Sequence, residues 1–233
     1  MRHEKPVQEV WLGREFKDHA KDLSIIVTEF LEAFTHLVIY KLRIFPAEKF
    51  QLSSFYGLLT QECTDPETSS YIHKASRSLR KWVLHQNLER YTVALVDNLA
   101  TSIAEYQVRF YQPEIAMKRK VFEFPKEAVE VNKQFKEVLR DFMDQVQPVK
   151  TDKSVSLRIY CKLAAGTVLE SKYGEHDWEE VWPTPSEIPP TLDSGPSVDT
   201  KLLQLHFQYR KVEAGDEFYE DPDEIDLSLD SYI

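Results

Sequence analysis

The chain has 233 residues with a formal net charge of −10, and 42% of its residues are hydrophobic. This length suits one domain with appended segments, and the composition supports a sizeable core, which excludes a disordered chain. The negative charge is concentrated at the C-terminal end, where residues 213–233 include nine acidic residues and no basic one. The rest is close to neutral and offers no broad basic surface for nucleic acid, so no direct nucleic-acid partner is predicted.

Cysteine usage and the first residues bear on the compartment. Cys63 and Cys161 lie far apart and form no CxxC pair, and the chain contains no N-x-S/T site. Both features favour a reducing compartment, which means the nucleus or the cytoplasm. Residues 1–22 lack the apolar segment that a signal peptide needs, so no secretory signal is expected.

Apolar residues recur at intervals of three and four after Asp22, which predicts a long core helix. These residues are Leu23, Ile26, Val27, Phe30, Leu31, Phe34, Leu37, Val38 and Leu42. Asp22 is the expected N-cap, and Pro46 is expected to end the helix because it cannot continue the hydrogen-bond ladder. Charged positions interrupt the apolar run at Glu29 and Glu32, so the segment is not expected to span a membrane.

A loop is expected after Pro46, followed by a second helix. Thr64 and Glu67 have the spacing of a capping box, and Pro66 is tolerated in the first turn of a helix. The predicted apolar face of this helix consists of Ile72, Ala75, Leu79, Trp82 and Val83. The segment therefore predicts a helix that packs on the first one.

Two strands and a third helix follow. Residues 91–96 are apolar on both faces, as in a central strand, and residues 104–110 alternate, as in a half-solvated strand, so the two predict a hairpin. A third helix is expected over residues 126–146, with Pro148 as its stop. After it, Val155, Leu157, Ile159 and Cys161 alternate with polar residues and predict a third strand.

The composition changes beyond this strand. Five of the twelve prolines fall between Pro183 and Pro196, in a stretch that also contains Trp178 and Trp182. This stretch is either a long ordered loop or a segment that folds over a ligand, and composition alone leaves both open. A last alternating run over residues 203–209 predicts a fourth strand. The order of elements indicates an α+β fold with helices on one face of an antiparallel sheet.

The sequence lacks the common motifs of enzymes. It contains no phosphate-binding loop, dinucleotide fingerprint, nucleophile elbow or zinc-protease motif. His176 and Asp177 could form half of a catalytic pair, but they read more simply as part of a solvated loop. The basic triplet at residues 118–120 also reads as a solvated loop. We therefore expect no enzymatic activity, no cofactor and no metal.

Four groups of residues form an ordered set along the chain. They are residues 30–40 with Arg43–Pro46; Phe50–Gln51, Tyr56, Gln61, Pro66–Glu67 and Tyr71–Ile72; Val138–Phe142; and residues 202–209. This set resembles the HORMA-domain family, and within it the accessory subunits of translesion DNA polymerase zeta. The resemblance covers roughly residues 23–212 and is most specific in the first third. Residues 1–22 and 112–124 and the acidic tail have no counterpart that we can place in these proteins.

The resemblance implies a non-enzymatic clamp. A short closure motif of a partner, such as a polymerase catalytic subunit or another repair protein, would add a strand beside the third strand under a C-terminal safety belt. The implied peptide-binding residues are Tyr56, Val155, Leu157, Arg158, Ile159, Tyr160, Trp178 and Trp182. Arg140 matches the position of a HORMA dimer contact, and a remodelling AAA+ ATPase would engage the N-terminal end.

These expectations define three segments and leave one alternative. The segments are an N-terminal extension (residues 1–22), a HORMA domain (23–212, with its belt from about 170) and an acidic tail (213–233). A proline in place of Arg158 is expected to remove an outward main-chain donor from the third strand. The alternative within the fold is a spindle assembly checkpoint protein, because residues 178–180 resemble the start of that protein's belt.

Overall fold

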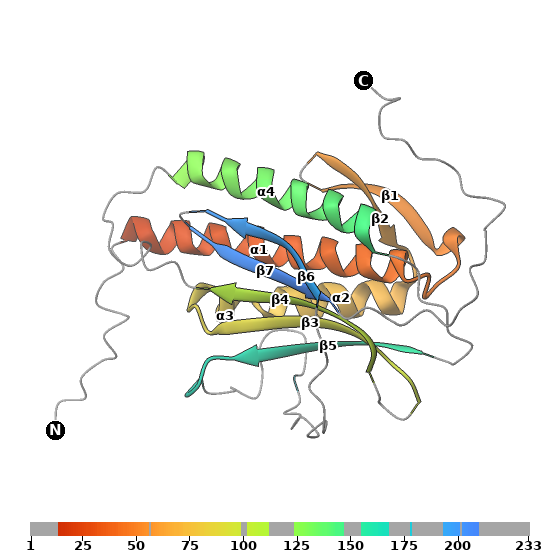
Figure 1. The fold of residues 1–233 in the computed structure, drawn as a ribbon. Helices are drawn as coiled ribbons and strands as arrows, with labels where there is room; N and C mark the ends of the chain where they lie inside the picture. Colours follow the sequence, from red (N-terminus) through yellow and green to blue (C-terminus); the bar gives the residue numbers. More distant parts are fainter. Residues whose placement is uncertain are drawn as a thin grey trace.

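Helix α1 (Arg14–Lys41) runs through the middle of the molecule (Figure 1). Between Phe30 and Ile39 every residue except Glu32 is buried, because α1 contacts other helices and the strand β2 around its circumference. The computed structural model describes residues 14–55, 57–98, 102–111, 124–146, 155–167, 178, 193–200 and 202–209. Within these ranges, residues 21–41 are long and apolar enough for a membrane span but are mostly buried in the fold, as expected for a core helix.

Both predicted ends of α1 were wrong. The helix begins at Arg14 and not at Leu23, because the polar residues before the apolar stripe include good helix formers that extend it. Its C-terminal end is set before Pro46 by Arg43, which has a positive φ of 52°. Ile44 N–H donates to Ile39 O (3.2 Å), and Arg43 N–H donates to Tyr40 O (3.0 Å). These two bonds form a Schellman motif, which satisfies the last carbonyls of the helix.

The segment after α1 forms a hairpin where a loop was expected. Strands β1 (Phe50–Phe55) and β2 (Leu58–Cys63) pair as a separate two-stranded sheet. Gly57 lies in the connection between the two strands and has a φ of 73°. Glycine adopts this left-handed backbone conformation at little cost. One face of β2 packs on α1, with Leu58 and Thr60 buried.

The predicted second helix is divided in two. Helix α2 (Pro66–Ser78) is followed by the short helix α3 (Arg80–Leu84). The N-cap of α2 is Asp65, not Thr64, because the Asp65 carboxylate accepts hydrogen bonds from the Thr68 N–H (3.2 Å) and hydroxyl (3.0 Å). These bonds hold the pKa of Asp65 below its usual value.

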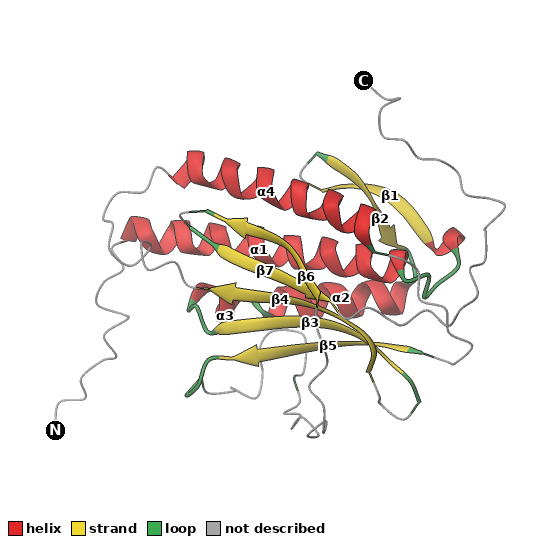
Figure 2. Ribbon diagram, viewed as in Figure 1, coloured by secondary structure: helices red, strands yellow, loops and turns green. Residues whose placement is uncertain are grey.

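The main sheet has five antiparallel strands in the order β5-β3-β4-β7-β6. Helices α1, α2 and α4 (Phe124–Gln145) lie on one side of it (Figures 1 and 2). The strands are β3 (Leu88–Val96), β4 (Ser102–Tyr111), β5 (Ser156–Leu163), β6 (Asp193–Asp199) and β7 (Gln204–Tyr209). The hairpin, third helix, third strand and last strand are thus confirmed, as is the α+β architecture.

Strand β6 lies in the stretch that sequence reasoning treated as a loop. It contains Pro196, which is tolerated because β6 is an edge strand and its register shifts between Ser194 and Ser197. A Cβ atom at Gly195 would lie 3.3 Å from both the Cβ atom and the carbonyl oxygen of Phe207, so this position requires a small residue. The end of the predicted belt therefore forms a hairpin, β6–β7, which pairs with β4.

Aromatic side chains join α1, α4 and β7 in the core. The Phe30 ring stacks on the Phe135 ring at a centroid distance of 4.0 Å and meets the edge of Phe207 at 5.8 Å. Phe34 contacts Phe207 (5.4 Å) and Phe142 (4.9 Å). The β6–β7 hairpin is therefore held to the helices by side-chain packing as well as to β4 by main-chain bonds.

Candidate peptide-binding edge

Strand β5 forms one edge of the main sheet. Along its length it pairs with β3, with Ile159 opposite Val93. Among the residues that the structure describes, no strand pairs with the other side of β5. An edge strand exposes main-chain donors and acceptors that can pair with an added strand.

The side chains of β5 alternate between the two faces of the sheet. Leu157, Ile159, Cys161 and Leu163 face the helices and are buried or half-buried, whereas Ser156, Arg158, Tyr160 and Lys162 are exposed. The predicted residues Val155, Leu157, Arg158, Ile159 and Tyr160 are therefore brought together on one strand and its approach. Their individual contacts with a peptide stay a prediction.

The hydroxyl of Tyr71 identifies which main-chain groups of β5 face outward. Ile159 N–H donates to Tyr71 Oη at 3.1 Å, so this N–H does not point toward β3. Because hydrogen-bonded and non-hydrogen-bonded pairs alternate in an antiparallel ladder, Leu157 and Cys161 also direct their N–H and C=O groups outward. Arg158 and Tyr160 direct theirs toward β3.

This geometry corrects the expectation for Arg158. Its side chain is exposed on the solvent face, but its main-chain groups belong to the ladder with Ala94 on β3. A proline at Arg158 would therefore break the existing sheet and leave the outer edge unchanged. A proline at Leu157, by contrast, would remove an outward donor.

Tyr71, on α2, is a site residue that the sequence analysis did not select. It appeared only as part of the pattern of resemblance, and its role depends on a contact 88 residues away in sequence that no local pattern reveals. Burial raises the pKa of Tyr71, so its side chain stays a neutral hydroxyl. It therefore caps the outward N–H of Ile159 on the open edge.

Trp178 is half-buried against α2 and α3. Its indole Nε1–H donates to Ser78 Oγ at 2.8 Å, and its ring meets the Trp82 ring at a centroid distance of 5.6 Å. Tyr71 and Ser78 lie seven residues apart on α2, which is about 10 Å along the axis of a helix. One helix thus carries both the residue that touches the β5 edge and the residue that anchors the belt tryptophan.

The other predicted site residues have different placements. Arg140 is exposed on α4, as expected for a surface contact, and its role in dimerisation stays a prediction. Tyr56 and Trp182 lie outside the described residues, as do His176 and Asp177.

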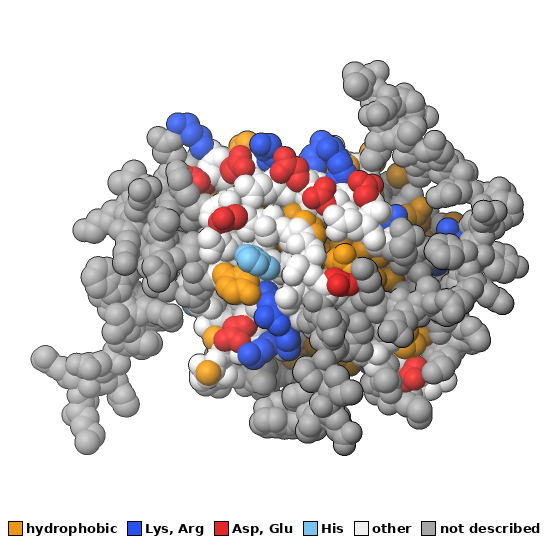
Figure 3. All heavy atoms as spheres, in the orientation of Figure 1, with side chains coloured by type: hydrophobic (Ala, Val, Ile, Leu, Met, Phe, Trp, Pro, Cys, Tyr) orange, Lys and Arg blue, Asp and Glu red, His pale blue; other side chains and the backbone are white. Residues whose placement is uncertain are grey.

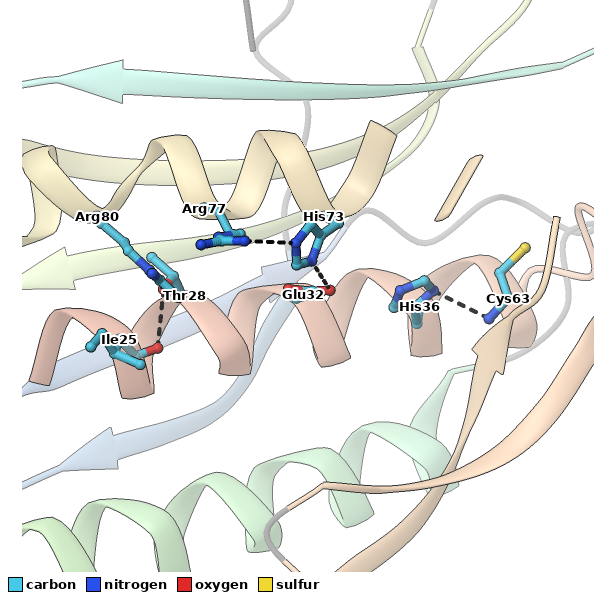
Figure 4. Close-up of polar contacts among 8 residues, drawn as sticks. All are labelled: Ile25, Thr28, Glu32, His36, Cys63, His73, Arg77 and Arg80. Carbon is cyan, nitrogen blue, oxygen red and sulfur yellow. Dashed lines mark hydrogen bonds and ion pairs between the residues drawn. The ribbon is translucent and has the colours of Figure 1, made fainter. Parts of the chain in front are cut away.

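A line of polar contacts joins α1, α2 and β2 on another side of the fold (Figure 4). His73 Nδ1 lies 2.9 Å from the Glu32 carboxylate, and Arg77 lies 3.3 Å from His73. His36 is 1% exposed, and its Nδ1 accepts a hydrogen bond from the Cys63 N–H at 3.2 Å. His36 is thus a core histidine, and burial lowers its pKa.

Neither cysteine has the features of a nucleophile. Burial raises the pKa of the Cys63 thiol and raises that of Cys161 well above its usual value, which disfavours the reactive thiolate. Within the described ranges, no group of three His, Cys, Asp or Glu side chains could hold a metal ion.

The lowered pKa of His36 predicts that the chain loses stability in acid. Around the ordinary histidine pKa of about 6.5, the unfolded chain binds a proton at this residue more readily than the folded chain does. The free energy of unfolding should therefore fall as the pH drops from 8 toward 5, and it should fall less in His36→Gln. Chemical denaturation at several pH values would measure this. His85→Gln, an exposed histidine, is the matched control, and equal slopes for His36→Gln and wild type would contradict the expectation.

Comparisons with known proteins support this reading of the fold. No family model matches the chain. The fission yeast (Schizosaccharomyces pombe) mitotic spindle checkpoint component mad2 is 31% identical over 70 residues, covering 30% of this chain and 34% of that protein. The human mitotic spindle assembly checkpoint protein MAD2B is 22% identical over 102 residues, covering 44% of this chain and 48% of that protein. The chain thus spans a third to a half of the length of the curated relatives that it matches.

Solved structures match over a larger part of the chain. A chain of the mitotic checkpoint complex matches with a TM-score of 0.66 and 18% identity, covering 82% of this chain and 95% of that one. C. elegans HTP-2 bound to the HIM-3 closure motif matches with a TM-score of 0.61 and 12% identity, covering 82% and 90%. The chain therefore has the HORMA fold. In sequence, it is similar to parts of mad2 and MAD2B.

Proposed function

We propose that this chain is a non-enzymatic adaptor that clamps a short closure-motif peptide of a partner protein against the open edge of β5, beneath its C-terminal belt. The observation that carries the proposal is the outer edge of β5, with which no strand among the described residues pairs, in a HORMA fold. Supporting it, structural neighbours of this chain are bound to closure motifs.

Strand addition suits the chemistry of this edge. The outward groups of Leu157, Ile159 and Cys161 provide main-chain donors and acceptors for an extended peptide. Main-chain pairing of this kind supplies affinity that depends little on sequence, and side-chain pockets add specificity. An incoming peptide would compete with the Tyr71 hydroxyl for the N–H of Ile159, so Tyr71 belongs to the proposed site.

Within this function, we propose the role of a polymerase zeta accessory subunit in translesion synthesis and DNA repair in the nucleus. The ordered residue resemblance supports it, and the partners would be a closure motif of the polymerase catalytic subunit, a second HORMA protomer at Arg140 and an AAA+ ATPase. The alternative is a spindle assembly checkpoint protein. Similarity to both mouse MAD2A (29% identical over 84 residues) and human MAD2B supports either role.

Peptide selection followed by hydrogen exchange tests the clamp. The full chain would be used to select binders from a displayed library of 16-residue peptides. Selected peptides are expected to bind with micromolar or tighter affinity and to slow exchange at the amides of Leu157, Ile159 and Cys161. Those of Arg158 and Tyr160, already in the ladder with β3, should change less. Binding that leaves the three outward amides unchanged would place the peptide elsewhere and refute the proposal.

Partner capture then distinguishes the two roles. The full chain would be used as bait in a nuclear extract, and the retained proteins would be identified by mass spectrometry. The repair role would be supported if subunits of a translesion polymerase are captured and are then displaced by a selected peptide. Checkpoint proteins lost under the same competition would support the alternative.

A further inference from the structure

Basic side chains form a row across four strands of the main sheet. Arg90 on β3 lies opposite both Arg109 on β4 and Lys162 on β5, and Arg109 lies opposite His206 on β7. The inward-facing neighbours of these residues in sequence, such as Tyr91 and Val108, are fully buried. The row Lys162–Arg90–Arg109–His206 therefore lies on the face away from the helices. Figure 3 shows Lys and Arg side chains gathered with a histidine on this face.

This arrangement opposes the stability of the sheet. Neighbouring strands lie about 4.7–4.9 Å apart, and like charges directly opposite each other destabilise a sheet. The Nε atom of Arg109 is buried and has no hydrogen-bond partner among the described residues. A sheet selected only for stability would not place three cations in one row, so the row is better explained by an anionic ligand.

Among the described residues, one acidic side chain forms an ion pair with a member of the row. Lys162 Nζ lies 3.0 Å from the Glu89 carboxylate. The Glu105 carboxylate accepts a hydrogen bond from Gln107 (3.1 Å), and the Asp199 carboxylate accepts one from Gln204 (2.8 Å). Glu89 is therefore the one carboxylate that the described contacts place on a member of the row.

An aromatic pair borders the β7 end of the row. The rings of Tyr111 and His206 lie 4.7 Å apart, and Tyr111 is 44% exposed. An exposed aromatic ring beside guanidinium groups can contact apolar or aromatic side chains of a ligand whose charge meets the cations. The surface therefore fits an acidic peptide segment that also carries aromatic residues.

We propose that the row Lys162–Arg90–Arg109–His206 binds the acidic tail of this same chain, residues 213–233. The tail has nine acidic residues and no basic one, and Phe218, Tyr219 and Tyr232 are interspersed among them. It follows β7 directly, since Glu213 lies seven residues after His206. Three of those residues belong to β7, which ends at Tyr209, so the chain can turn back across the sheet only after that residue. The 21 residues of the tail reach about 70 Å when extended, which exceeds the width of about 15 Å across four strands. The link to β7 raises the effective concentration of the tail at the row, and the proposal is independent of the peptide clamp.

Zero-length cross-linking of the full chain tests the proposal. A carbodiimide couples an amine to a carboxylate that it touches, and mass spectrometry locates the bond. We expect intramolecular links between Lys162 and carboxylates of residues 213–233. Their yield should fall at least fivefold in 0.5 M salt, which shortens the range of electrostatic attraction. The link between Lys162 and Glu89 serves as an internal control for the reactivity of the lysine.

Two double variants with the same change of charge sharpen the test. Arg90→Gln with Arg109→Gln should lower the yield of Lys162–tail links at least fivefold. Lys74→Gln with Lys133→Gln removes two exposed charges elsewhere and should leave the yield unchanged. Because like charges on neighbouring strands repel, the first variant should melt at or above the melting temperature of the wild type. A lower yield of links in this variant would then reflect loss of tail binding and not unfolding.

Three results would overturn the proposal. Tail carboxylates that couple to Lys118 or Lys120 in place of Lys162 would place the tail on the basic triplet. A yield that is unchanged by the first double variant would show that the row does not hold the tail. An absence of Lys162–tail links, together with binding of a 20-nucleotide single-stranded DNA that the first double variant loses, would identify the row as a nucleic-acid surface.

Discussion

Replacing Leu157 by proline is expected to lower affinity for selected peptides at least tenfold while the chain stays folded. The N–H of Leu157 points away from β3, so its loss removes no bond of the existing sheet. A docked strand would lose one hydrogen bond and would contact the proline ring. Because about 1.4 kcal/mol of binding free energy corresponds to a tenfold change in affinity, these two effects together account for the expected loss. Fluorescence anisotropy with a labelled selected peptide would measure it.

Two further variants control for the change of side chain. Leu157→Ala loses the same half-buried packing but keeps the N–H, so it should bind peptide within about threefold of the wild type. Arg158→Pro removes a donor from the ladder with β3 and should lower the melting temperature. If Leu157→Pro remains folded and binds like Leu157→Ala, the outer edge of β5 is not the docking site.

Elements with strong periodicity could be predicted from the sequence. The apolar stripe of α4 and the alternation in β4 and β5 depend on burial of one face, and the apolar run of α1 depends on burial on nearly all sides. Burial of either kind leaves a pattern in the residues. The ends of α1 were harder to predict, because its first turns are polar and its last turn is closed by Arg43 in a left-handed conformation. Neither feature produces a repeating pattern of apolar residues in the sequence.

Two of the three missed hairpin strands, β1 and β6, lack such a pattern. Strand β1 includes Gln51, Ser53 and Ser54, and its largest apolar residue in the middle, Leu52, is 64% exposed. Strand β6 contains Gly195 and Pro196, which usually indicate a loop. Both strands form because a partner strand completes their hydrogen bonds, and pairing between strands is not visible in either segment alone.

The candidate site was predicted in part for a related reason. The alternation from Val155 onward located the strand, and the resemblance identified it as an edge. Which main-chain groups point outward depends on the register with β3, so the orientation of Arg158 was predicted wrongly. The contact of Tyr71 with Ile159 and that of Trp178 with Ser78 both join distant segments, and they required the structure.

Truncating Phe207 to alanine is expected to cost about 3–5 kcal/mol of stability, as large-to-small changes of phenylalanine in cores do. The Phe207 side chain is 3% exposed and touches both Phe30 and Phe34 of α1. For a chain of this size, such a loss lowers the melting temperature by roughly 6–20 °C. Calorimetry of the full chain would measure it, and a shift of less than 2 °C would show that β7 packs loosely on α1.

The same substitution tests whether the closing hairpin is part of the clamp. Strand β7 holds β6 and pairs with β4, so weakening its packing on α1 weakens the segment to which the belt connects. We therefore expect Phe207→Ala to speed dissociation of a selected peptide at least tenfold at a temperature where the variant is still folded. The control is His206→Ala, which changes an exposed neighbour on the opposite face of β7 and should leave the dissociation rate within twofold. Equal dissociation rates for both variants and the wild type would mean that the β6–β7 hairpin stabilises the fold without retaining the peptide.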